Sequence, residues 1–213
     1  LANRHGEYLQ AIPTLKHFCA NNTENERGTA SSDVDVRTLN EYYYAAFERP
    51  ITCGGAYSVM VAYNELSGVP AVINPDIQKV LKDRWGLGFV VTDGGDFSQN
   101  VTFHKYSESH AETIALAIKN GTDVMTDCED VVEAAVFEAL NSGLVSEKDI
   151  DKALYNSLLA RFRLGEFDEK HPFSDVCEMM IDNEEHKCLN RRAALEQMVL
   201  PVSYTHLRAH ETP

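Results

Sequence analysis

Hydrophobic and polar positions follow two different patterns along the chain, and each pattern predicts one kind of element. Short apolar runs bounded by turn residues are typical of buried strands, and they occupy residues 11–18, 57–63, 88–92 and 122–125. Apolar side chains repeated every three or four positions predict helices over residues 33–49, 75–84, 109–120, 129–141 and 146–164. This order is typical of α/β proteins whose parallel strands are joined by right-handed crossovers, in a barrel or an open doubly wound sheet.

Polar residues at the expected helix starts agree with these boundaries. Asp33 or Asp35 is placed to cap the first helix, and Asn74 is placed to cap the second. Ser146 is followed three residues later by Asp149, which is the spacing of a capping box. The helix boundaries are therefore supported by local chemistry as well as by apolar spacing.

The alternation ends in the last quarter of the chain. Charged residues dominate residues 166–174, which indicates the edge of a domain. Helical spacing returns over residues 184–200, with Leu189, Ala193 and Met198 as the expected inward positions.

Residues 201–213 differ in character from the helical pattern before them. They resemble a translated sequencing adapter, so we expect this tail to be non-native. His206 and His210 are four residues apart, a spacing that could bind a metal on a helix, but they belong to this tail and are set aside.

Composition and charge narrow the classes of function. A chain of 213 residues with 44% hydrophobic side chains can bury a sizeable core. The formal net charge of -14 argues against a nucleic-acid partner, since phosphate binding needs clustered Lys and Arg. No run approaches the roughly 18 apolar residues of a membrane span, so no membrane partner is expected. No strand is followed by a Gly-x-Gly-x-x-Gly or Walker loop, so nucleotide binding has no support either.

The cysteines bear on the cellular compartment. They are odd in number and form no C-x-x-C pair, which argues against a closed disulfide framework. A reducing compartment, and hence the cytoplasm, is favoured. The five positions are Cys19, Cys53, Cys128, Cys177 and Cys188.

Asp93 stands directly after the apolar run at residues 88–92, and two glycines follow it. Strand ends of this kind hold the catalytic groups of many α/β enzymes. Gly94 and Gly95 permit a tight turn and leave space beside the carboxylate for a ligand. Residues 94–106 are then expected to form a loop. From the residues alone, Asp93 is either a capping or turn residue or a catalytic carboxylate.

The four expected strand ends offer one set of side chains: Lys16 and His17, Met60 and Tyr63, Asp93, and Asp127. In a parallel barrel these ends share a face and line one pocket. Their chemistry suits a sugar, because Lys and His donate to hydroxyls, Tyr and Met cover an apolar sugar face, and a carboxylate can attack the anomeric carbon. Met60 and Tyr63 as plain core residues, and His17 as a buried histidine, stay open as alternatives.

Five motifs follow one another between residues 10 and 165. They read Lys16-His17-Phe18 followed by Asn21-Asn22-x-Glu24-x-x-Arg27, then Arg37-Thr38-Leu39-x-Glu41-x-Tyr43, Ser58-Val59-Met60-x-x-Tyr63-Asn64, Trp85-Gly86-x-x-Gly88-Phe89-Val90-Val91-Thr92-Asp93, and Gly121-Thr122-Asp123-Val124-Met125. In this order they resemble glycoside hydrolase family 3, the β-glucosidase and β-xylosidase family. Five ordered matches are far more specific than any one of them.

The resemblance implies a fold and a function. The fold would be the C-terminal half of a (β/α)8 TIM-type barrel followed by a helical linker. Residues 1–168 would form this partial catalytic barrel domain, and residues 169–200 would be a linker toward an α/β sandwich domain outside the chain. The function would be that of a retaining glycoside hydrolase that removes β-linked glucose or xylose from oligosaccharides or glycosides.

The resemblance also implies roles for site residues. Asp93 would be the catalytic nucleophile. Lys16, His17, Met60 and Tyr63 would form the sugar subsite. No cofactor and no metal is expected, and the partner would be a β-glycoside or oligosaccharide substrate.

Two local details bear on the choice of sugar. The family branch that acts on N-acetylglucosamine carries a Lys-His-Phe-Pro-Gly-His-Gly loop, whereas residues 16–22 read Lys-His-Phe-Cys-Ala-Asn-Asn, which favours a glucosidase or xylosidase. The residue after the nucleophile is often Trp or another large side chain in the family. Here it is Gly94, which changes the wall of the adjoining subsite.

A retaining mechanism needs two carboxyl groups about 5 Å apart, one to attack and one to protonate the leaving oxygen. The family usually takes its acid/base Glu from the sandwich domain, so we expect that residue to lie outside this chain and the chain alone to be inactive. Asp96, Glu24 and Asp127 are the other nearby carboxylates, and none matches a known acid/base motif.

Two other classes of function are compatible with parts of the pattern. Asp93 could be the aspartyl nucleophile of a phosphoryl-transfer enzyme, although such enzymes generally place a second, magnesium-binding carboxylate two residues on, whereas Asp96 lies three on. The chain could also be a noncatalytic carbohydrate-binding fragment.

Overall fold

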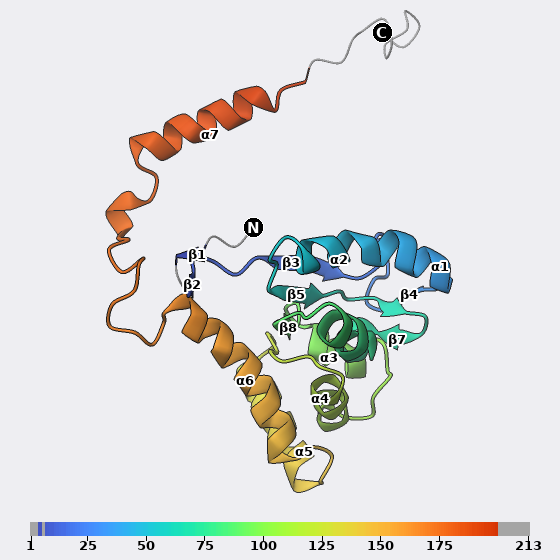
Figure 1. The fold of residues 1–213 in the computed structure, drawn as a ribbon. Helices are drawn as coiled ribbons and strands as arrows, with labels where there is room; N and C mark the ends of the chain where they lie inside the picture. The colour runs from blue at the N-terminus through green and yellow to red at the C-terminus, as the bar shows by residue number, and fades with distance from the viewer. Residues whose placement is uncertain (1–3, 6, 200–213) are drawn as a thin grey trace, which may run out of the picture. The chain divides into compact units, whose positions relative to one another are not determined.

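The computed structural model describes residues 4–5 and 7–199 and shows an α/β fold in which helices accompany a parallel sheet (Figure 1). The chain divides after His171 into two units, each with its own internal packing. The tail expected to be non-native, residues 201–213 with His206 and His210, lies outside the described residues.

Three parallel strands form the main sheet of the first unit: β3 (Thr14–Phe18), β5 (Ser58–Val61) and β8 (Phe89–Val91). Their order in the sheet is their order in the chain. A single parallel bridge joins Val91 to Val124, so the fourth strand expected over residues 122–125 is reduced to one paired position. The predicted α/β alternation with parallel strands is confirmed.

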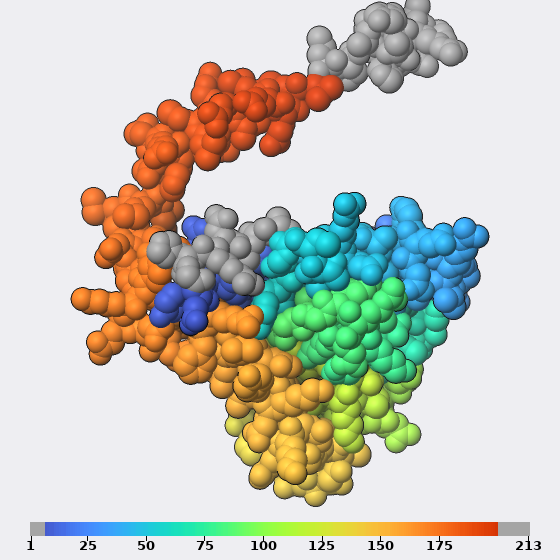
Figure 2. Space-filling view, in the orientation of Figure 1, coloured from blue at the N-terminus to red at the C-terminus, as the bar shows by residue number. Residues whose placement is uncertain are grey.

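Helical segments follow each strand. After β3 come α1 (Val36–Thr38), the π-helical η1 (Leu39–Tyr44) and α2 (Ala45–Thr52); after β5 come η2 (Ala71–Ile73) and the π-helical η3 (Ile77–Arg84); after β8 come α3 (Asp96–Thr102), α4 (His110–Lys119), α5 (Glu129–Asn141) and α6 (Glu147–Leu164). In the space-filling view of this unit, the light-blue and cyan atoms of the segments after β3 lie directly against the green atoms of later segments (Figure 2).

The helix caps follow the local sequence signals. Of the two candidates for the first helix, Asp35 is the cap, since its side chain accepts hydrogen bonds from two backbone N–H groups of the first turn. The Asn74 side chain accepts from the Asp76 N–H, 2.9 Å away. Ser146 and Asp149 form both bonds of a capping box at the start of α6. The predictions for Asp35 and for Ser146 with Asp149 are confirmed, whereas the residue at the N-cap of η3 is Asp76 rather than Asn74.

Residues 94–106, expected to be a loop, contain α3, so that prediction was wrong. The first turn of α3 is capped from a distant part of the chain: the Asp127 carboxylate accepts from the N–H groups of Phe97 and Ser98, at 3.2 and 3.1 Å. The Phe97 side chain is fully buried and holds the helix against a core cluster that includes Ile114. Packing and a long-range cap thus form a helix where the glycines suggested a loop.

Short strands within the loops pair with one another in two small sheets. β1 (Arg4–His5) pairs with β2 (Tyr8–Leu9), and a second small sheet contains β4 (Ser31–Ser32), β6 (Glu65–Leu66) and β7 (Val69–Pro70). The pairing of β4 with β6 brings the segment that follows β3 beside the segment that follows β5. This contact gathers two loops at the carboxyl end of the main sheet.

The two faces of the main sheet differ in burial. Val59 and Val90 are fully buried and belong to the larger core cluster beneath the helices. At alternate positions Met60, Phe89 and Val91 are only half-buried. One face is therefore closed by helices, and the other is partly open.

The second unit, within the described residues 172–199, contains η4 (Glu178–Met180) and α7 (Glu184–Glu196). The helix predicted over residues 184–200 is present but ends at Glu196. Its expected inward residues, Leu189, Ala193 and Met198, are all exposed, so that part of the prediction was wrong. Apart from α7, the described residues 172–199 contain only the short η4, so this unit offers no second long helix or strand against which α7 could bury a face. Across the described chain, no helix has both the length and the apolar character needed to cross a membrane.

Candidate functional site

Asp93 lies at the carboxyl end of β8, where the backbone is firmly held. The preceding residue, Thr92, is fully buried, and Thr126 donates to it twice: from its N–H to Thr92 Oγ1 at 2.9 Å and from its hydroxyl to the Thr92 carbonyl at 2.8 Å. The Gly94 N–H donates to Asp93 Oδ1 at 2.8 Å. The Asp93 side chain remains 24% exposed, so a fixed carboxylate is accessible to a ligand.

His17 faces the other oxygen of this carboxylate. Its Nε2 lies 2.9 Å from Asp93 Oδ2, at the distance of an ion pair rather than in the geometry of a hydrogen bond. β5 lies between β3 and β8, so the contact spans the end of the middle strand. A protonated His17 imidazole would form an ion pair with Asp93.

Tyr63 reaches the same site from the loop after β5. Its hydroxyl donates to the Gly94 carbonyl at 2.7 Å, and the Arg27 guanidinium lies 4.4 Å from the centre of its ring. Burial raises the pKa of Tyr63, the negative charge of Asp93 adds to the rise, and Arg27 opposes it. Because the ordinary value is already about 10, the hydroxyl stays protonated and remains a donor at neutral pH.

The structure places the remaining predicted residues at different distances from this cluster. Met60 is half-buried in β5 and pairs with Val91, two residues before Asp93. Lys16 is exposed in β3, and its side chain makes no hydrogen bond or ion pair with any described residue. His17 therefore contacts Asp93 directly, and Tyr63 contacts Gly94, the residue after Asp93. The Lys16 side chain has no such contact with the cluster.

Two nearby carboxylates are already engaged. Asp127 accepts from the Ser98 hydroxyl at 2.7 Å in addition to the N–H groups of Phe97 and Ser98. Glu24 receives a 2.7 Å bond from the Arg27 guanidinium. Asp127 thus serves as a helix cap, and Glu24 is paired.

Asp96 is 1% exposed, and its Oδ2 has no hydrogen-bond partner among the described residues. Burial raises the pKa of this carboxyl well above its ordinary value, and the negative charges of Asp127 and Asp93 raise it further. The folded protein therefore keeps a proton that the unfolded chain releases above about pH 4. It follows that this group favours folding at acid pH and loses that contribution as the pH rises toward its folded pKa.

We therefore expect Asp96→Asn to raise the free energy of unfolding at pH 7 by on the order of 1 kcal/mol, because the buried group no longer has to hold a proton. The gain should shrink at pH 4, where the wild-type carboxyl is protonated in the folded state and about half protonated in the unfolded chain. Urea unfolding of both proteins at the two pH values measures this. A variant that is less stable than the wild type at pH 7 would contradict the prediction.

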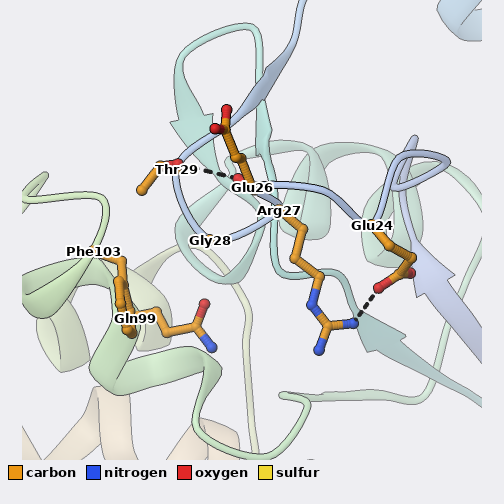
Figure 3. A pocket seen from close by; sticks show the side chains of 7 residues that line it. All are labelled: Glu24, Glu26, Arg27, Gly28, Thr29, Gln99 and Phe103. Atoms are coloured by element: carbon orange, nitrogen blue, oxygen red, sulfur yellow. Dashed lines mark hydrogen bonds and ion pairs between the residues drawn. The ribbon is translucent and has the colours of Figure 1, made fainter.

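A pocket of about 350 Å³ lies beside Arg27, the residue whose guanidinium stacks on the Tyr63 ring. Seven residues line it: Glu24, Glu26, Arg27, Gly28, Thr29, Gln99 and Phe103 (Figure 3). Figure 3 shows the paired Arg27 and Glu24 on one side and Gln99 with Phe103 on the other. A Cβ atom at Gly28 would lie 3.1 Å from Gln99 Oε1, so the loop approaches α3 closely here.

The sequence offered unequal signals for these pocket residues. Glu24 and Arg27 belong to the first of the five motifs, but the stacking of Arg27 on Tyr63 is visible only in three dimensions. Gln99 and Phe103 fall in the segment expected to be a loop, and no pattern singled them out. Over residues 4–5 and 7–199, no group of three or more His, Cys, Asp or Glu side chains is arranged to hold a metal ion.

Curated relatives match almost the whole chain. It is 31% identical over 202 residues to a probable exo-1,4-β-xylosidase of Aspergillus clavatus, a match that covers 90% of this chain and 26% of the relative. It is 36% identical over 189 residues to a β-glucosidase of Rhizobium radiobacter, covering 88% of this chain and 21% of the relative. The chain thus spans about a quarter of the length of these proteins. A scan against models of protein families finds no match.

Solved structures agree with these matches. A family 3 exo-β-xylosidase in complex with a xylobiose aziridine activity-based probe has a TM-score of 0.76 at 25% identity, covering 89% of this chain and 25% of that one. A β-glucosidase from Erythrobacter marinus has a TM-score of 0.79 at 28% identity, covering 90% of this chain and 26% of that one. The resemblance expected from the five motifs is confirmed. Over about a quarter of their length, the chain is similar to curated β-xylosidases and β-glucosidases and to a solved exo-β-xylosidase of glycoside hydrolase family 3.

Proposed function

We propose that this sequence forms part of the catalytic domain of a longer retaining glycoside hydrolase that removes β-linked glucose or xylose from oligosaccharides or glycosides. The observation that supports this most directly is the placement of Asp93. It is a fixed, accessible carboxylate at the carboxyl end of a parallel sheet, with His17 Nε2 2.9 Å from one oxygen. Parallel α/β domains place their catalytic groups at this end. The relatives' names as β-xylosidases and β-glucosidases support the class of reaction.

The proposal extends to the fold. We propose that residues 1–168 are the later half of a (β/α)8 barrel and that residues 169–200 are a linker toward an α/β sandwich domain. The order β3–β5–β8, with each strand pairing with the previous one, is the order of strands around such a barrel. The partly open face that contains Met60, Phe89 and Val91 would then be turned toward the barrel interior.

In the first chemical step, an Asp93 oxygen forms a bond to the anomeric carbon while the bond from that carbon to the leaving oxygen breaks. The leaving oxygen takes a proton from a general acid. Asp127 and Glu24 are engaged and Asp96 is buried, so we propose that this acid belongs to a part of the enzyme beyond residues 1–213. The product of the step is a glycosyl ester of Asp93.

In the second step, water loses a proton to the same acid/base group and attacks the anomeric carbon. The ester bond breaks, and Asp93 regains its carboxylate. Two inversions give net retention of the β configuration. Lys16 and His17 would donate hydrogen bonds to the sugar hydroxyls, while Met60 and Tyr63 would cover an apolar face of the ring.

A mechanism-based label tests this proposal. A glycoside with fluorine at carbon 2 and a good leaving group forms the glycosyl ester but hydrolyses it slowly, because fluorine destabilises the cationic transition state. We expect the full-length enzyme to gain one fluoroglycosyl group, and peptide mass spectrometry to locate it on Asp93. We expect residues 1–213 alone, under the same conditions, to gain none. Labelling of a different residue would refute the assignment of the nucleophile.

A further inference from the structure

A fully buried histidine links the loops around the site. The His104 side chain is 0% exposed; its Nε2 lies 2.9 Å from the Tyr63 carbonyl oxygen, and its Nδ1 lies 3.1 Å from Glu65 Oε1. His104 follows α3, whereas Tyr63 and Glu65 follow β5. The ring therefore connects the segment after Asp93 with the loop that contains Tyr63.

The two contacts fix where protons must lie on this pair. A carbonyl oxygen only accepts, so Nε2 of His104 has to bear a hydrogen. An ionised Glu65 carboxylate also only accepts, so Nδ1 has to bear one too, unless the proton resides on Glu65 itself. A neutral ring beside an ionised carboxylate would set two lone pairs against each other across 3.1 Å. Both hydrogen bonds therefore require one proton more than a neutral ring and an ionised carboxylate hold together.

Tyr63 is held at both ends by this arrangement. Its carbonyl accepts from His104, and its hydroxyl donates to the Gly94 carbonyl at 2.7 Å. Gly94 in turn donates its N–H to Asp93 Oδ1. Three hydrogen bonds, joined by the covalent structure of Tyr63 and Gly94, thus connect His104 to the carboxylate proposed to attack the sugar.

Through Glu65, His104 is also linked to the loop after β3, whose residues line the pocket. The Glu65 N–H donates to the Ala30 carbonyl at 3.0 Å, within the pairing of β4 with β6. Arg27, three residues before Ala30, lies over the Tyr63 ring. His104 itself belongs to the segment after β8, it binds the loop after β5 directly, and it is linked to the loop after β3 through Glu65.

We propose that His104 is a positioning residue that fixes Tyr63 relative to Asp93 through its two hydrogen bonds. This inference rests on the proposed glycosidase function, because Tyr63 matters for turnover only if a sugar binds against it. His104 does not touch the substrate itself, since its ring is fully buried. Its effect is exerted through the placement of the Tyr63 ring and hydroxyl.

The first test removes the two ring nitrogens of His104 in the full-length enzyme by substitution with phenylalanine. We expect His104→Phe to lower kcat/KM for an aryl β-glycoside about 100-fold per active site, since a misplacement of about 1 Å costs that much. Active sites are counted with the fluorinated glycoside, so misfolded protein does not enter the rate. The matched control is His110→Phe, because His110 is half-buried against Phe97 and its Nε2 has no hydrogen-bond partner among the described residues. It should stay within about twofold of the wild type.

A double-mutant cycle shows whether His104 acts through Tyr63. If it does, adding His104→Phe to Tyr63→Ala should cost less than about threefold more than Tyr63→Ala alone. Independent, multiplying effects would overturn the proposal. So would a His104→Phe enzyme with wild-type kcat and KM.

Glu65 supplies a variant pair that separates positioning from simple loss of folding. In Glu65→Gln the amide can donate to Nδ1 of a neutral ring whose Nε2 still donates to Tyr63, so both bonds survive and kcat/KM should remain within about threefold. Glu65→Leu removes the partner of Nδ1 and should cost about 10-fold or more. Equal losses in the two variants would refute the role of the hydrogen bonds. A wild-type enzyme without β-glycosidase activity would instead refute the proposed function, so the two failures are distinguishable.

Discussion

Replacing Asp93 with alanine is expected to lower kcat of the full-length enzyme by at least about 10⁴-fold, because the variant lacks the oxygen that bonds to the anomeric carbon. No neighbouring carboxylate can take over: Asp127 and Glu24 are engaged, and Asp96 is buried. The measurement is steady-state hydrolysis of an aryl β-glycoside with a good leaving group, which needs little help from the general acid. KM should change far less than kcat.

The vacated space offers a second, qualitative result. Azide added to the Asp93→Ala enzyme should attack from the side that the carboxylate occupied, in a single inversion, and yield an α-glycosyl azide. The matched control is Asp130→Ala, an exposed carboxylate in the first turn of α5, which should keep wild-type turnover. An Asp93→Ala enzyme that retained a tenth of its turnover would show that another group is the nucleophile.

The second large effect is expected at Asp123, which ties three elements together. Its side chain is 2% exposed and accepts from Lys82 Nζ at 2.7 and 2.6 Å, from the Val90 N–H at 2.8 Å and from Asn156 Nδ2 at 2.9 Å. These partners belong to η3, β8 and α6. Burial lowers the pKa of Lys82, while the Asp123 charge opposes that fall. The carboxylate therefore compensates an ammonium group that is only 8% exposed.

We expect Asp123→Ala to lower the free energy of unfolding by about 3–5 kcal/mol, because it leaves the Lys82 charge buried without its partner. Replacing both members, as Lys82→Met with Asp123→Leu, should recover much of the loss. Urea unfolding measures both variants. The matched control is Asp151→Ala in α6, which is exposed and should stay within about 0.5 kcal/mol of the wild type. A cost below 1 kcal/mol for Asp123→Ala would contradict this account.

Local chemistry explains which parts of the fold the sequence could predict. Asp35 caps the first helix from within its own first turn, and Ser146 with Asp149 does the same for α6. Such bonds span three residues and leave a readable spacing. The cap of α3 is different, because Asp127 lies about thirty residues after the N–H groups that it binds. Because α3 begins just after two glycines and its capping residue is remote in sequence, its sequence resembles that of a loop.

The same distinction applies to the site. Asp93 and His17 could be nominated because each stands at the end of an apolar run, where parallel sheets expose their polar groups. His104 could not be nominated. Its partners Glu65 and Tyr63 lie 39 and 41 residues earlier, and no periodic pattern connects positions so far apart. Residues that touch a ligand follow strand ends, whereas those that hold them in place depend on tertiary contacts.

The agreement between strand order and chain order has a consequence for biosynthesis. Because β5 pairs with β3 and β8 pairs with β5, each strand finds its neighbour already present when the ribosome releases it. Chains are made at about 5–20 residues per second, so β3 and β5 can associate seconds before α6 is translated. Nascent apolar segments are then covered progressively, which shortens the time that they are available to chaperones or to aggregation.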